Sequence, residues 1–220
     1  MKKKNVFMLA GALSLIVVVF SSLVYANEDS TVKQFISNFF DHIKHEIDIR
    51  EDGIVAKLND IEITEERYIF YKRNVEMIQK IEGTNDKIDD IELINEMIGK
   101  DLTVQYAENM GITADPDEVD KVVEFQRNLL NDPSVTGPNN ELVKEIMRNR
   151  IRITGLSEDE FWKSDEIRDQ YRESVIISHL FDQLAQNGEV QDMNDFSEFQ
   201  DNLIDQKKEQ IEIITPNIKE

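Results

Sequence analysis

Hydrophobic residues recur at three- and four-residue steps along most of the chain, which is the pattern of amphipathic helices. The predicted helices cover about residues 31–49, 64–82, 90–110, 116–130, 141–151, 165–187 and 195–210. Candidate caps support this interpretation: Asp115 precedes Pro116, and Ser157 with Glu160 fits a capping box shortly before the long helix. The sequence therefore predicts a mainly α-helical fold.

Two short segments show strand patterns instead of helical ones. Residues 54–63 alternate on either side of Asn59-Asp60, a turn signal, and so predict a β-hairpin. Residues 211–215 form a second apolar alternation, which Pro216 ends. We expect this C-terminal strand to pair with residues 54–58, which gives a small β-ribbon joining the N-terminal hairpin to the end of the chain.

The first 26 residues have the pattern of a secretory signal. Three lysines precede an uncharged stretch over residues 6–23, and Val24 and Ala26 are small residues at the −3 and −1 positions. The pattern favours a signal peptide cleaved between Ala26 and Asn27. An uncleaved membrane anchor is the alternative, because the apolar stretch is just long enough to span a bilayer. Both interpretations place the body outside the cytoplasm, and an exported chain without cysteine favours a bacterial source.

The charge balance and the missing motifs exclude several classes of function. The chain has 45 Asp and Glu against 25 Lys and Arg, and this net charge of −20 argues against a nucleic-acid partner. There is no cysteine, no Gly-x-Ser-x-Gly nucleophile motif and no phosphate-binding glycine loop. His42 and His45 lie three residues apart beside Asp41 and Glu46, which is not the spacing of zinc-protease helices. We therefore predict no catalytic residue, no metal and no cofactor.

The segment 27–53 contains an amphipathic lead helix with an unusually aromatic stripe. The stripe consists of Val32, Phe35, Ile36, Phe39, Phe40, Ile43 and Ile47. Packing on the body, dimerisation and attachment to a membrane surface are the three alternatives. Packing is favoured, because a membrane-surface helix usually carries a basic polar face and this one does not.

Three further segments carry a family resemblance. Residues 54–67 combine the hairpin pattern with a Thr64 start signal, residues 93–120 include the exit Met-Gly-Ile-Thr at 110–113, and residues 155–161 begin Gly-Leu-Ser ahead of the long helix. In this order and spacing they resemble the N-terminal chaperone domain of SurA-type and PrsA-type extracytoplasmic folding factors. Leu58 and Asp60 stand where the family usually has valine and glycine. The resemblance covers about residues 54–187.

This resemblance implies a helical chaperone cradle, completed by a returning helix and strand, here residues 188–220. Full-length family members often contain a parvulin-type prolyl isomerase domain. Only 33 residues follow Asn187, which is too few for such a domain, so we carry over no isomerase activity. The predicted function is an extracytoplasmic chaperone-like protein that binds unfolded or newly exported polypeptides.

Exposed aromatic residues are the natural candidates for contacting such clients. The candidates are Tyr68, Tyr71, Phe125, Phe161 and Trp162. For each of them the alternative is ordinary packing in a hydrophobic core. Two alternative functions also stay open: a dedicated envelope or spore-layer interaction protein, and a peptidyl-prolyl isomerase as in the full-length family.

Overall fold

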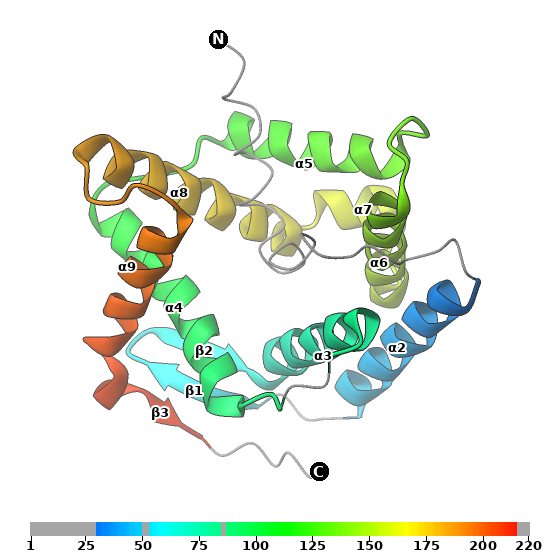
Figure 1. Ribbon diagram of the computed structural model, residues 1–220, viewed down its shortest axis with the longest axis horizontal. Coiled ribbons are helices and arrows are strands. Elements are labelled where there is room, and N and C mark those ends of the chain that lie inside the picture. Colours follow the sequence, from blue (N-terminus) through cyan, green and yellow to red (C-terminus); the bar gives the residue numbers. More distant parts are fainter. Residues whose placement is uncertain (1–29, 50–52, 85–86, 215–220) are drawn as a thin grey trace. The chain divides into compact units, whose positions relative to one another are not determined.

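The computed structural model describes residues 30–49, 53–84 and 87–214 and is mainly helical (Figure 1). The helices are α2 (Ser30–Asp48), α3 (Glu65–Glu82), α4 (Asp90–Asn109), α5 (Pro116–Asn131), α6 (Pro138–Thr154), α7 (Glu158–Lys163), α8 (Asp165–Asn187) and α9 (Met193–Asp205). The strands are β1 (Ile54–Leu58), β2 (Ile61–Thr64) and β3 (Glu212–Ile213), and a 3-10 turn, η1 (Lys208–Gln210), precedes β3. The predicted mainly α fold with a small β-ribbon is confirmed.

Local signals set most of the helix starts. The Asp115 carboxylate accepts a hydrogen bond from the backbone N–H of Asp117, and Ser157 and Glu160 form the predicted capping box. Two predicted helices have other bounds in the structure. The helix expected over residues 195–210 spans Met193–Asp205 and is followed by the separate turn η1, and the helix expected over residues 141–151 begins at Pro138 and ends at Thr154. Proline is well suited to the first helical turn, so Pro138 starts α6 instead of belonging to the preceding loop.

The sheet is antiparallel, with the strand order β2-β1-β3. In its register Ala56 lies opposite Ile213 and Lys57 lies opposite Glu212. The Ile214 N–H also donates to the Val55 carbonyl at 2.8 Å. The C-terminal strand therefore pairs with the first hairpin strand, as the sequence predicts.

The chain divides into two compact units, which we describe separately. Unit 1 comprises Met1–Ile49, Arg73–Asn85 and Ala114–Val175, and unit 2 comprises Arg50–Lys72, Asp86–Thr113 and Ile176–Glu220. Helices α3 and α8 contribute residues to both units. The predicted segment 54–187 is likewise shared between the two.

In unit 1 the lead helix α2 packs against α6. Ile36, Phe40 and Ile43 are fully buried, which is the expected result for an apolar stripe with a partner helix. Arg152 of α6 reinforces this packing by donating to the Asp41 carboxylate at 2.5 Å and to the Ser37 carbonyl at 3.0 Å. Of the three alternatives for this helix, the structure shows packing on the body.

The core of unit 1 gathers buried side chains from α5, α6, α7 and α8. Its members are Val119, Val123, Leu130, Met147, Ile151, Phe161, Trp162, Ile167, Tyr171 and Val175. Beside it, the buried Lys144 ammonium donates to the carbonyls of Asp132 and Val135, at 2.7 and 2.6 Å. These two bonds fix the short loop between α5 and α6, because a buried cation needs nearby acceptors.

Within the described ranges, no helix combines the length and the apolar character needed to cross a membrane. The predicted signal or anchor segment, with its cleavage site at Ala26 and Asn27, lies outside the described residues.

Candidate polypeptide-binding surface

Three of the five predicted client-binding aromatics are buried. Tyr68 is 1% exposed, Phe161 is 2% exposed and Trp162 is 3% exposed. The rings of Phe161 and Trp162 meet edge to face at 5.3 Å, and Trp162 lies 6.3 Å from Tyr171, all in the core of unit 1. A ring enclosed in this way gives its surface to its own fold, so core packing is the role that the structure supports for these three.

The other two predicted residues reach solvent to different degrees. Tyr71 in unit 2 is half-buried, and its hydroxyl donates to the Glu96 carboxylate at 2.9 Å. Burial, reinforced by the Glu96 charge, raises the pKa of Tyr71 above its usual value. Phe125 on α5 of unit 1 is 46% exposed and is the most exposed member of the predicted set.

A different set of aromatics forms a continuous row in unit 2. Tyr106 of α4 contacts Phe199 of α9 edge to face at 5.2 Å, and Phe199 lies 5.9 Å from Phe196. Phe196 in turn contacts Phe181 of α8 at 5.4 Å. Phe196 is buried at the centre, whereas Tyr106, Phe181 and Phe199 are half-buried and keep part of each ring accessible.

The packing of α9 on α4 positions this row. Gly99, Thr103 and Tyr106 occupy one face of α4 and meet α9 in antiparallel order. A Cβ atom on Gly99 would lie 2.5 Å from the Ile204 Cδ1 atom, so glycine allows the two helices to approach closely. At the next turn the Gln200 amide donates to the Thr103 hydroxyl at 3.1 Å.

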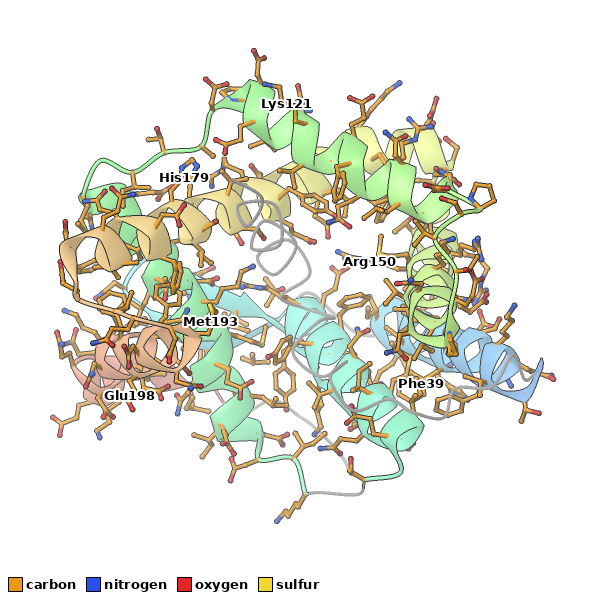
Figure 2. All side chains as sticks on the ribbon, turned by 45° about the horizontal axis from the view of Figure 1, so that its top comes forward. Phe39, Lys121, Arg150, His179, Met193 and Glu198 are labelled. Carbon is orange, nitrogen blue, oxygen red and sulfur yellow. The ribbon has the colours of Figure 1, made fainter. Side chains whose placement is uncertain are left out.

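Two exposed methionines stand close in sequence to members of the row. Met110 is 40% exposed and follows Tyr106 by four residues, while Met193 is 52% exposed and precedes Phe196 by three (Figure 2). Residues at these spacings share one face of a helix. We name Tyr106, Met110, Phe181, Met193 and Phe199 together the aromatic–methionine surface.

The chain around this surface is acidic. Between Arg172 and Lys207 the sequence has eight Asp and Glu residues and neither Lys nor Arg. Asp182, Glu198 and Asp201 are exposed, and Figure 2 shows Glu198 on α9. His179 of α8 is half-buried, with its Nδ1 atom 3.1 Å from the Thr113 carbonyl, which requires that this nitrogen donate the hydrogen bond.

The surface consists of side chains suited to non-covalent contact. Among the described residues, no group of three or more His, Asp or Glu side chains is placed to hold a metal ion. What the geometry provides is accessible aromatic and thioether surface. Methionine adapts its shape to different partners, and aromatic rings supply large contact areas at a small cost in conformational entropy.

The sequence analysis missed these residues although it placed several of them on helices. The signal that was available is the spacing of Met193, Phe196 and Phe199 on a helix that has no basic residue. Comparison of the chain with protein-family models, with curated proteins and with solved structures found no match.

Proposed function

We propose that the protein is an extracytoplasmic chaperone-like protein that binds unfolded or newly exported polypeptides by non-covalent contact, without isomerase activity. The observation that carries this proposal is the aromatic–methionine surface of unit 2. Its half-buried rings and exposed methionines are the residue types that bind many different apolar side chains.

The physical argument begins with what an unfolded client exposes. Its apolar side chains are in water, and their transfer onto another apolar surface is favourable by roughly 25 cal/mol for each Å² buried. A row of side chains held in place by helix packing binds them with little loss of its own entropy. The strongly acidic body, with a net charge of −20, favours solubility of the loaded complex.

The return of the C-terminal segment also supports the proposal. The helix α9 packs on α4, and β3 pairs with β1, so the end of the chain completes unit 2. A returning helix and strand are what the resemblance to SurA-type and PrsA-type folding factors implies. In this protein the returning helix contributes Met193, Phe196 and Phe199 to the candidate surface.

Suppression of aggregation tests this function directly. A chemically denatured test protein is diluted into buffer with the purified protein, and light scattering is followed. We expect suppression at near-stoichiometric ratio, with the activity reduced in Phe199→Ala and retained in Phe125→Ala, which removes an exposed ring from unit 1. No suppression at several-fold excess would contradict the proposal, and activity on one client among many would favour a dedicated interaction protein.

A further inference from the structure

Two carboxylates of α4, Asp90 and Asp101, are neutralised by cations of α3. Arg67 donates to both oxygens of Asp101 at 2.6 Å, and Lys72 donates to Asp90 at 2.7 Å. These pairs form inside unit 2 and leave little charge for a partner. At these two places, where α3 contacts α4, each carboxylate of α4 has a cationic partner on α3.

The carboxylates around the aromatic–methionine surface are arranged differently. Asp182 lies on α8 one residue from Phe181, and Glu198 and Asp201 lie on α9 one and two residues from Phe199. At these spacings they project from other sides of the helices than the rings do. All three are exposed, and within the described residues none of them has an ion-pair partner or a side-chain hydrogen bond. The helices that carry the apolar contact surface therefore also carry negative charge without a neutralising cation.

The exposed ring of unit 1 lies in a mixed environment. On α5, Phe125 is flanked in the sequence by Glu124 and by Arg127, which pairs with Glu158 at 3.5 Å and also with Asp159. Asp120 of the same helix pairs with Arg168. Exposed apolar surface combined with charge of one sign is thus found at the unit 2 surface and not at Phe125.

From this contrast we infer that the aromatic–methionine surface selects polypeptide segments in which aromatic residues stand next to lysine or arginine. The inference rests on the proposed function and names its substrate class. Apolar contact supplies the affinity, and the acidic residues of α8 and α9 attract cationic side chains and repel acidic ones. Lysine and arginine also bind favourably over the faces of aromatic rings such as Tyr106 and Phe199.

Three fluorescent peptides of equal length test this selectivity by anisotropy: one with aromatic residues and lysine, one with the same aromatics and glutamate, and one with serine and lysine. We expect the aromatic–lysine peptide to bind on the order of tenfold more tightly than the aromatic–glutamate peptide. The difference should shrink as salt is added, because exposed charges are screened beyond about 8 Å at physiological ionic strength. The serine–lysine peptide should not bind measurably, because it brings no apolar contact.

Two variants with the same change in net charge provide the control. Glu198→Lys places a cation beside the surface, whereas Glu124→Lys does so on α5 beside Phe125; both positions are exposed and helical. We expect Glu198→Lys to lose most of the preference for the lysine peptide and Glu124→Lys to keep it. An equal loss in both variants would mean that net charge alone acts, and this would overturn the inference.

The remaining outcomes separate this inference from the proposed function. Equal affinity for the lysine and glutamate peptides would overturn the selectivity and leave the holding function in place. Failure of both aromatic peptides to bind would contradict both. A dimer seen by analytical ultracentrifugation and dissociated by Phe199→Ala would show that a second copy covers the surface, which would also overturn the inference.

Discussion

The two units each contain a cluster of touching aromatic rings, and the two clusters differ in how far their rings are buried. In unit 1 the rings of Phe161, Trp162 and Tyr171 are 5.3 to 6.3 Å apart and all buried. In unit 2 the rings of the Tyr106–Phe199 row are 5.2 to 5.9 Å apart, yet three of the four are only half-buried. Ring contact alone therefore does not distinguish a closed core from a partly exposed row, whereas coverage by surrounding helices does.

The difference follows from how many elements surround each cluster. In unit 1 the short helix α7 contributes its rings to a core that also receives side chains from α5, α6 and α8. In unit 2 the row lies along the line where α9 meets α4, with Phe181 of α8 at one end. Leaving rings partly in water forfeits stability, and such exposed apolar surface is often kept for binding.

The largest expected effect is a loss of stability when a ring is removed from the buried cluster of unit 1. Trp162→Ala removes a buried ring from the core of unit 1, and we expect a loss of about 3–5 kcal/mol in the free energy of unfolding, because the cavity cannot collapse fully. Urea unfolding followed by circular dichroism measures it. At urea concentrations below the unfolding transition, the folded variant should bind client as the wild type does. A loss below about 1 kcal/mol would contradict the closed core.

The second prediction tests, by the pH dependence of stability, whether the unit 1 cluster is shielded from water. Burial raises the pKa of Tyr171 to about 12. An unfolded tyrosine ionises near pH 10, so between pH 10 and 12 the unfolded state loses its proton while the folded state keeps it, and stability falls as pH rises. We expect about 3 kcal/mol of loss across this window, at 1.36 kcal/mol for each pKa unit.

Urea unfolding of the wild type and of Tyr171→Phe across that window measures this contribution. The single tryptophan, Trp162, reports unfolding by its fluorescence. Tyr171→Phe removes the hydroxyl and should flatten the pH slope by the Tyr171 share, while other tyrosines continue to contribute. Identical slopes in the two proteins would show that Tyr171 is accessible to water.

Phe199→Ala tests the half-buried row. It should reduce binding more than stability, which is the opposite of the result expected for Trp162→Ala. Its two ring contacts are worth about 0.5–1.5 kcal/mol each, so we expect a modest loss of about 1–2 kcal/mol in stability. Client affinity measured by anisotropy should fall by on the order of tenfold. The matched change Phe125→Ala should leave stability within about 0.5 kcal/mol and binding unchanged. Equal binding losses in both variants would remove the distinction between the units.

The smallest expected effect on stability concerns the packing of α9 on α4. Gly99→Ala improves helix propensity by about 1 kcal/mol, but its new Cβ atom would lie 2.5 Å from the Ile204 side chain. We expect the contact to cancel this gain in the wild type and the gain to appear in an Ile204→Ala background. A double-mutant cycle in urea measures the coupling. Equal effects in both backgrounds would show that α9 does not approach Gly99 closely.

Local signals made much of the fold predictable. Capping residues such as Asp115 and Ser157 act through neighbours within three residues, so their effect is visible in the sequence. The pairing of β3 with β1 was also predictable, because an apolar strand at the chain end needs a sheet edge to satisfy its backbone. The start of α6 at Pro138 was not predicted, because the stretch around it has the residue types of a turn.

The candidate surface was less predictable from the sequence than the fold was. Tyr68 and Trp162 appeared equal to Phe125 in the sequence, yet the structure buries the first two and exposes the third. The exposure of Phe181 and Phe199 could not be predicted from their spacing, because it depends on where α9 returns along α4. A helical stripe tells which side of a helix is apolar, and it does not tell how many other elements cover that side.

The sequence by itself determined the helical class, the caps, the hairpin and the acidic charge, because these depend on residue type and on spacing along the chain. Only the tertiary structure decided which aromatic rings lie in a closed core and which form the aromatic–methionine surface. The physical reason is that solvent exposure is set by contacts between residues far apart in sequence, as between Tyr106 and Phe199.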